Sequence, residues 1–248
     1  MKNNYHAPPT HGFVFGKHNG NYVVKSEDKD GHIMVVGGVG RGKSTCIAMP
    51  TLRAWKSTVF AIDIKGELSG YASKYRKNIK VFNPQDKNSY GYDPYMFLNN
   101  STNPAQEARA IAQAIIPLPP DTKDPFWIDN AQTLLTGAIL HYSDIGYSFI
   151  DTLQEIQANG VISLVNVLAD SGNKKAQICV GGFADMVDSQ GKPNKTLSGI
   201  FAEVSRGILP LVLDDDIVSA LSREETISPE DLEFGRDIFL NIPEHLLR

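Results

Sequence analysis

Gly37-Gly38-Val39-Gly40-Arg41-Gly42-Lys43-Ser44 is the segment of this 248-residue chain that says most about its fold. It fits the pattern GxxxxGK[ST] of a phosphate-binding loop, the Walker A motif, and Thr45 follows it. Glycines let the backbone turn its N–H groups inward around phosphates, and a helix that begins near Gly42 adds the positive end of its dipole. The segment therefore predicts that the chain binds a nucleoside triphosphate.

Two residues at the end of this loop have specific expected roles. Lys43 is expected to place its charge at the β- and γ-phosphates, where it would act in catalysis, and the Ser44 hydroxyl is expected to coordinate Mg²⁺. ATP and Mg²⁺ are therefore the predicted cofactors. The residues predicted to contact the nucleotide are Gly37, Gly38, Val39, Gly40, Arg41, Gly42, Lys43, Ser44 and Thr45.

Short apolar segments around the loop indicate an α/β domain. Uninterrupted apolar runs of this length are typical of parallel strands covered on both faces. Pro50 lies in the helix after the loop and should kink or restart it. The predicted strands are a hairpin at Phe13–Phe15 and Tyr22–Val24, then His32–Val36, Val59–Ile62, Ile79–Phe82 and, near the end of the chain, Asp237–Ile242.

Between these strands the pattern changes to helical periodicity. Asn103-Pro104 and Asp124-Pro125 each start a helix, since a capping residue precedes a first-turn proline. Further helices are expected at Phe149–Ala158, Val161–Ala169, Lys175–Met186 and Thr196–Leu209, and Asp214-Asp215-Asp216 favours one more helix N-terminus. We therefore expect an all-helical domain at 103–210, inserted between the α/β segments 1–102 and 211–248.

Asp63 follows the predicted strand Val59–Ile62 and has two interpretations. An apolar strand that ends in Asp has the form of a Walker B carboxylate, which would hold Mg²⁺ and act in catalysis together with Glu67. Alternatively, Asp63 caps the next turn, while Lys65 and Glu67 are solvated. The local sequence does not decide between these interpretations.

Charge and hydropathy add two expectations. The net charge is −4 and the isoelectric point about 5.9, so the overall charge gives no reason to expect a nucleic-acid partner. No basic–aromatic stripe is visible, and the basic stretch Lys74–Lys80 is interpreted as ordinary solvated surface. No apolar run reaches the roughly 18–20 residues that cross a bilayer, so the chain is expected to be cytoplasmic and to have no membrane segment.

Taken together, these segments resemble the type IV secretion coupling proteins, conjugative DNA-transfer ATPases of the FtsK–HerA class. Asp63-Ile64-Lys65-Gly66-Glu67 is similar to the DxKGE element of that family, and Pro50 is similar to its proline after the loop. The other matching segments are Gly12–Lys17, Val81-Phe82-Asn83-Pro84 with Tyr92-Asp93-Pro94, Phe126-Trp127-x3-Ala131, and Ile238-Phe239-Leu240-Asn241-Ile242-Pro243-Glu244.

The resemblance implies a partial RecA-like P-loop nucleotide-binding domain with an all-helical inserted domain. It also implies a homo-hexamer in the complete protein, which links a complex of DNA and relaxase to type IV secretion channel proteins at the cytoplasmic face of the bacterial inner membrane. The transmembrane helices that usually begin such proteins are absent from this chain, and so is the second acidic strand that follows residues 237–242 in the family. We therefore expect a chain truncated at both ends that hydrolyses ATP poorly, with Asp63 as an accessory element.

Two other functions remain open at this point. A small-molecule kinase would use the same loop with an arginine-rich lid, but the helical region has only Arg109 and Arg206 without an arginine cluster. A non-catalytic docking module would bind partner proteins through the helical part and keep the nucleotide for structural reasons.

Overall fold

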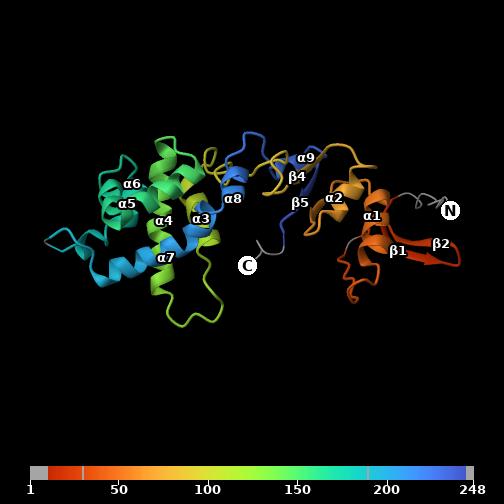
Figure 1. The fold of residues 1–248 in the computed structure, drawn as a ribbon, viewed down its shortest axis with the longest axis horizontal. Helices are drawn as coiled ribbons and strands as arrows, with labels where there is room; N and C mark the ends of the chain where they lie inside the picture. The colour runs from red at the N-terminus through yellow and green to blue at the C-terminus, as the bar shows by residue number, and fades with distance from the viewer. Residues whose placement is uncertain (1–10, 30, 189, 244–248) are drawn as a thin grey trace. The chain divides into compact units, whose positions relative to one another are not determined.

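The computed structural model describes residues 11–29, 31–188 and 190–243, which form two compact units (Figure 1). The α/β unit consists of Met1–Tyr90 and Ile227–Arg248, and the helical unit consists of Gly91–Thr226. The chain thus leaves the α/β unit once and returns to it near the end. This confirms an α/β fold that carries a helical insertion, while the domain limits expected at 102/103 and 210/211 stay a prediction.

A three-stranded parallel sheet forms the centre of the α/β unit. Its order is β3 (Phe60–Ile62), β5 (Asp237–Leu240), β4 (Ile79–Phe82), so β5 pairs with both neighbours although it comes last in the chain. Asp237, Ile238 and Phe239 of β5 are buried. The three apolar runs predicted as parallel strands are therefore confirmed.

Two short helices cover this sheet. Leu52 of α1 (Met49–Ala54) and Ala72 of α2 (Glu67–Ala72) pack with Phe239 of β5 in one buried cluster. Helix α2 escapes sequence prediction because six residues are too few to display a helical period. Because this apolar cluster is small, polar contacts also contribute to the stability of the α/β unit.

The N-terminal hairpin is confirmed. Strands β1 (Phe13–His18) and β2 (Asn21–Lys25) pair antiparallel, and the turn residues Asn19 and Gly20 have φ values of 48° and 81°. Positive φ at both central residues is the geometry that two-residue hairpin turns favour. The backbone N–H of Val14 donates to the Thr51 hydroxyl at 2.9 Å, which ties the hairpin to α1.

The strand predicted at His32–Val36 is wrong. These residues are irregular, and the side chains of Met34 and Val36 are 88% and 82% exposed. Apolar composition indicates that a segment suits a sheet, but a strand forms only where a neighbour offers backbone partners. Within the described residues, the sheet contains β3, β5 and β4 and none of them pairs with this segment.

Arg76 connects the end of α1 to the start of the central strand. Its Nε donates to Asp237 Oδ2 at 2.5 Å and its second terminal nitrogen to Asp237 Oδ1 at 2.9 Å, so the pair is bidentate. The same guanidinium donates to the carbonyls of Leu52, Trp55 and Ser57. The Asp237 carboxylate also accepts the Val59 N–H at 2.9 Å. One buried pair therefore joins α1, the start of β3 and β5.

Asp231 fixes the returning chain in a similar way. This buried carboxylate, in α9 (Glu230–Glu233), lies 3.0 Å from Lys80 Nζ and 2.8 Å from an Arg236 terminal nitrogen, and it accepts the Ser228 N–H at 2.8 Å. Burial opposes ionisation of Asp231, but the hydrogen bonds from Arg236, Ser228 and Lys80 outweigh it and lower its pKa. The segment before β5 is thus held against β4 by charge.

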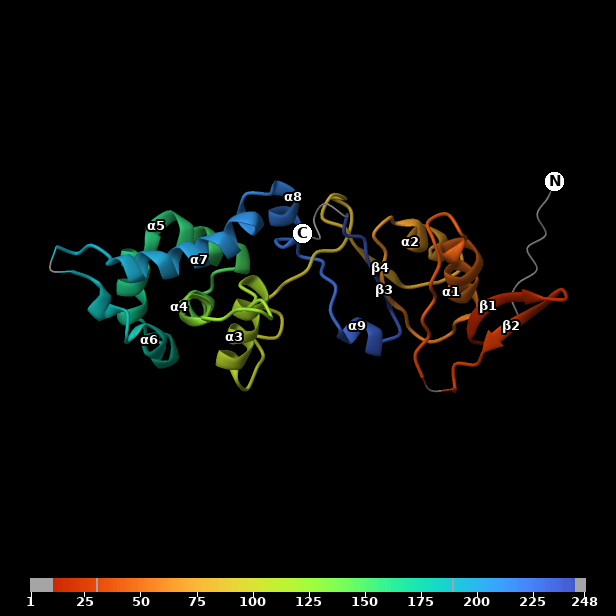
Figure 2. The same ribbon diagram turned by 90° about the horizontal axis from the view of Figure 1, so that it is seen from below.

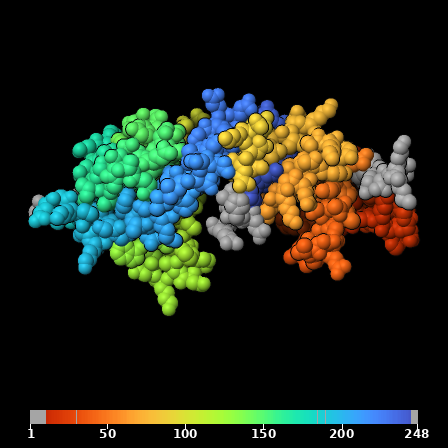
Figure 3. Space-filling model, in the orientation of Figure 1, coloured from red at the N-terminus to blue at the C-terminus, as the bar shows by residue number. Residues whose placement is uncertain are grey.

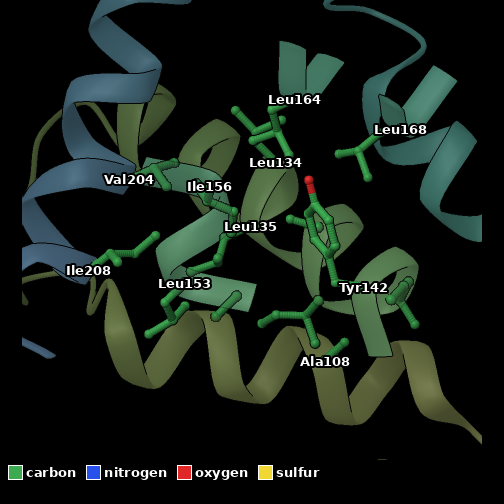
Figure 4. Close-up of a cluster of buried hydrophobic side chains, with 14 of the residues drawn as sticks. Ala108, Leu134, Leu135, Tyr142, Leu153, Ile156, Leu164, Leu168, Val204 and Ile208 are labelled. Atoms are coloured by element: carbon green, nitrogen blue, oxygen red, sulfur yellow. The ribbon is translucent and has the colours of Figure 1, made fainter. Parts of the chain in front are cut away.

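The helical unit is organised around α4 (Phe126–Asp144). This helix contacts α3 (Pro104–Ile115), α5 (Phe149–Ala169), α6 (Lys174–Val180) and α7 (Lys195–Val212), as Figures 1 and 2 show. Figure 4 shows the core between these helices, to which α4 contributes Leu134, Leu135 and Tyr142. The remaining elements of the unit are the 3-10 turn η2 (Ala184–Met186) and α8 (Asp215–Ala220).

Most of the predicted helices are confirmed, and two details match closely. Helix α5 bends at Gly160, where φ is 72° and ψ 177°, so it consists of the two helices expected at 149–158 and 161–169. Asp214 caps α8, because its carboxylate accepts the N–H groups of Asp216 and Ile217 at 2.9 and 3.1 Å. The single helix expected at 175–186 is instead divided into α6 and η2.

We predict that Arg76→Gln destabilises the α/β unit by about 3–5 kcal/mol, since it leaves the buried Asp237 carboxylate without its cation. The measurement is the free energy of unfolding from urea titration. Lys77→Gln is the control, because Lys77 is the adjacent basic residue and is exposed; we expect a change within about 0.5 kcal/mol. Equal stability of Arg76→Gln and the wild type would contradict the role given to the pair.

We predict that Gly207→Ala destabilises the helical unit by about 1–3 kcal/mol, although alanine is the better helix former. A Cβ at Gly207 in α7 would stand 3.0 Å from the Ile115 carbonyl oxygen and 2.9 Å from the Ile116 side chain. Thermal unfolding followed by circular dichroism measures the change. Ser198→Ala, at an exposed position of the same helix, should shift the melting temperature little; a Gly207→Ala variant as stable as this control would refute the close approach.

Candidate functional site

The phosphate-binding motif forms an open loop that leads directly into a helix. Gly40 and Gly42 have φ values of 72° and 80°, which only glycine adopts without strain. A Cβ at Gly42 would stand 3.0 Å from Cys46 Sγ. The helix begins at Lys43 with the wide turn η1 (Lys43–Ala48) and continues as α1. Gly42, which the motif requires, and Gly40, at one of its variable positions, are therefore needed by the backbone itself.

Pro50 explains the wide turn. The Met49 N–H donates to the Ser44 carbonyl, five residues back, immediately before the proline. A proline ring clashes with the carbonyl four residues earlier in a regular α-helix, and one wide turn removes that conflict. The helix therefore restarts at Met49, one of the two effects predicted for Pro50, and continues as α1 to Ala54.

Lys43 closes the loop on itself. Its ammonium nitrogen donates to the carbonyl oxygens of Gly37 and Gly38, at 2.6 and 2.9 Å. The side chain thus lies across the loop rather than pointing away from it. An anion that enters the loop can take over these two contacts, because the lysine is exposed and is not engaged by a described carboxylate.

The remaining loop residues fit a phosphate chain with its metal ion. Val39 is 96% exposed, and Arg41, Ser44 and Thr45 are also exposed, so described side chains do not cover the loop. The segment that carries it lies at the surface (orange-red in Figure 3). Hydroxyls at Ser44 and Thr45, the Lys43 ammonium and the first amides of a helix form a donor set suited to phosphates.

Asp63 lies at a different turn and serves as a cap there. It is 4% exposed, and its Oδ2 accepts the backbone N–H of Ser69, in the first turn of α2, at 2.8 Å. Lys65 and Glu67 are exposed. This is the geometry of the capping interpretation. Among the described residues, no hydrogen bond joins Asp63 or Glu67 to residues 37–45.

Sequence reasoning gave no role to Ser69 and Asn241, which complete this turn. The Asn241 amide donates to the Ser69 hydroxyl at 3.1 Å, and its backbone N–H donates to the Phe82 carbonyl at 2.8 Å. A Cβ at Gly66, where φ is 67°, would meet the Asn241 amide nitrogen at 3.2 Å. Asn241 directly follows β5, as Asp63 follows β3, and this shared position after a strand is the signal that could have found it.

These polar residues lie where the parallel strands end. Asp63 follows β3, Asn83 follows β4 and Asn241 follows β5, and the Asn83 backbone N–H donates to the Ser89 hydroxyl at 3.0 Å. In open α/β sheets, ligands bind outside the carboxyl ends of the strands. The turn at Asp63 therefore lies at the carboxyl ends of the parallel strands, the edge where ligands bind in this class of sheet.

Comparison with known proteins identifies a family and relatives that match between half and nine-tenths of the chain. The family described as type IV secretory system, conjugative DNA transfer, matches residues 4–225. Protein VirD4 of Rhizobium rhizogenes is 29% identical over 253 residues, covering 90% of this chain and 36% of the relative. Conjugal transfer protein TraG of Escherichia coli is 30% identical over 152 residues, covering 52% of this chain and 24% of TraG.

Solved structures show the same fold. The bacterial conjugative coupling protein TrwBdeltaN70, in an unbound form, superposes with a TM-score of 0.50 at 16% identity, covering 84% of this chain and 45% of that chain. TrwB in complex with a non-hydrolysable ATP analogue also gives 0.50, at 17% identity, with 84% and 46% covered. The chain thus spans about a third of the VirD4 relative and less than half of these structures.

We predict that Asp63→Ala destabilises the α/β unit by about 1–3 kcal/mol, because the buried Ser69 N–H loses its acceptor. Asp63→Asn keeps an oxygen in place and should recover most of this loss. Urea unfolding of both variants measures the difference. If Asp63 instead held the metal ion, Asp63→Asn would keep the stability but lose Mg²⁺-dependent nucleotide affinity, a result that would remove the capping role as the main one.

Proposed function

Because this chain belongs to the type IV secretory system conjugative DNA transfer family, we propose that it is the nucleotide-binding part of a coupling protein. In the complete protein this part would drive or license DNA transfer, and it would bring a complex of DNA and relaxase to the secretion channel. The observation that carries the proposal is the exposed loop at residues 37–45, in which Gly40 and Gly42 have positive φ and Lys43 lies across the loop on the carbonyls of Gly37 and Gly38.

The loop residues divide the work of binding. We assign the β- and γ-phosphates to Lys43, whose ammonium would exchange the carbonyls of Gly37 and Gly38 for phosphate oxygens. The backbone of Gly38–Thr45 would wrap the phosphates with its N–H groups, since side chains leave it uncovered. TrwB, which shares this fold, is known in complex with an ATP analogue, in keeping with ATP as the ligand here.

A magnesium ion fits beside these residues. Ser44 is exposed at the first turn of the helix, and a hydroxyl at this position of the motif is the usual protein ligand of Mg²⁺. Bound Mg²⁺ would supply neutralisation of the charge on the phosphates. Ser44 would orient the ion, while Lys43 would stabilise charge that develops on the terminal phosphate.

The turn at Asp63 would act by position. Asp63 holds the first turn of α2 through Ser69, and this places the exposed Glu67 at the carboxyl edge of the sheet. We propose that Asp63 is a positioning residue and that Glu67 faces the nucleotide or a neighbouring subunit. Direct metal binding by Asp63 would require it to give up the Ser69 cap.

Partners and location follow from the family. We propose a homo-hexamer in the complete protein, with relaxase-bound DNA as cargo, channel proteins as partners, and a position at the cytoplasmic face of the inner membrane. Across the ranges that the structure describes, no helix combines the length and apolar character needed to cross a bilayer. Family membership speaks against the small-molecule kinase, and Arg206 of the helical unit is engaged by Glu203 at 2.6 Å.

We predict that Lys43→Ala weakens binding of a fluorescent ATP analogue by at least about tenfold, or about 1.4 kcal/mol, because a charge-assisted contact to the phosphates is lost. Titration of the full chain in Mg²⁺ measures it, and removal of Mg²⁺ with a chelator should weaken the wild type as well. Lys87→Ala, an exposed lysine outside the loop, is the control. Unchanged affinity in Lys43→Ala would refute the assignment, and phosphate release in the same samples tests the expected weak hydrolysis.

A further inference from the structure

A cleft with basic and aromatic walls lies in the α/β unit, away from the phosphate-binding loop. It has a volume of about 370 Å³, and its walls include Arg53, Trp55, Lys56, Tyr75 and Lys77. The cleft is next to Asp237, the first residue of β5, and therefore at the amino ends of the parallel strands. The loop at residues 37–45 lies at the opposite end of the helix formed by η1 and α1, roughly 18 Å along its axis.

The positive charge of the cleft is largely uncommitted. Arg76 is neutralised by Asp237, but neither Lys56 nor Lys77 is within 4.0 Å of a carboxylate among the described residues. Both lysines are exposed. The nearby acid is Glu27, and its oxygens already accept the N–H groups of Lys56 and Ser57 and the Ser57 hydroxyl. An anion that enters the cleft therefore meets free cations and a carboxylate that is already occupied.

Aromatic faces accompany these cations. Tyr75 is 50% exposed, with the Arg53 guanidinium 4.7 Å from the centre of its ring. The ring of Tyr71 lies beside it, with ring centres 5.0 Å apart and the two planes tilted by 46°. A second hollow of about 280 Å³ adjoins the cleft through the shared residues Trp55 and Thr58, and its lining is mainly apolar. A ligand that fits both hollows has an anionic part and flat apolar parts.

We propose that this cleft binds a single strand of nucleic acid, with phosphates at Lys56 and Lys77 and bases against Tyr75 and the hollow beside Trp55. Stacking on aromatic side chains together with backbone contacts to lysine is how proteins bind single strands without sequence preference. A duplex keeps its bases stacked inside and offers no face to Tyr75. The combination is not visible in the sequence, since one part comes from residues 53–58 and the other from residues 75–77.

The test is fluorescence anisotropy of a labelled 20-nucleotide oligothymidylate with the full chain. We expect Lys56→Ala/Lys77→Ala to weaken binding about tenfold and to reduce the slope of log Kd against log salt by about 1.4, because each lost phosphate contact removes about 0.7 from a single-strand slope. Tyr75→Ala should also weaken binding about tenfold, and Tyr75→Phe should keep wild-type affinity because the ring remains. Lys87→Ala/Lys123→Ala removes the same charge outside the cleft and should change neither quantity.

Three results would overturn the proposal. One is equal binding by Lys56→Ala/Lys77→Ala and the control double variant, with matching thermal unfolding to show that both are folded. Another is competition by a 20-base-pair duplex or by polyphosphate as strong as that by the single strand, which would identify a general anion site. The third is equal loss in Tyr75→Phe and Tyr75→Ala. Lys43→Ala should bind the strand normally, so failure of nucleotide binding and failure of this site are distinguishable.

Discussion

The buried pair of Arg76 and Asp237 is the contact on which the α/β unit depends. The apolar cluster around Phe239 is small, and the sheet places its last strand between two earlier ones. The guanidinium joins the end of α1, the segment before β3 and the first residue of β5 in one network. Arg76 and Asp237 are 161 residues apart along the chain. Removing either Arg76 or Asp237 leaves the other charge buried and unpaired. Loss of one partner therefore destabilises the strand order by more than the net energy of the pair would indicate.

The helix formed by η1 and α1 has a different polar site at each of its ends. Its first turn carries the phosphate-binding loop, where the amides and Lys43 meet negative charge, and its last turn is held by Arg76. Cations at the C-terminal end of a helix are favoured by its dipole, as anions are at its start. The helix dipole therefore has a favourable charge partner available at each end. Pro50, in the middle of the helix, is accommodated by one wide turn rather than by a break. The loop and the cleft beside Trp55 therefore lie at the two ends of one helical segment.

What the sequence could and could not predict follows from the range of each signal. The glycines of the loop, the apolar runs of the three parallel strands and the helix start at Asp124-Pro125 are local patterns, and they were predicted. The segment at 32–36 has a strand composition, yet pairing depends on partners that composition does not reveal. Asp63 had two local interpretations, and its hydrogen bond with the Ser69 N–H, six residues on, is a contact that the capping interpretation expects. Asn241 and the basic–aromatic cleft are formed by residues distant in sequence, which no window of sequence brings together.

The junction between the two units has a consequence for how such a chain can change over time. Gly91, the first residue of the helical unit, forms a bridge with Thr226, its last residue, and the Gly91 N–H donates to the Glu225 carbonyl at 2.7 Å. A Cβ at Gly91 would stand 2.7 Å from the Ala220 carbonyl oxygen, so the beginning and the end of the helical unit are held close together. An insertion whose ends meet in this way is interchangeable: its helices can diverge, or another module can replace them, without rethreading the sheet. The helical unit can therefore diverge independently of the unit that carries the loop at residues 37–45.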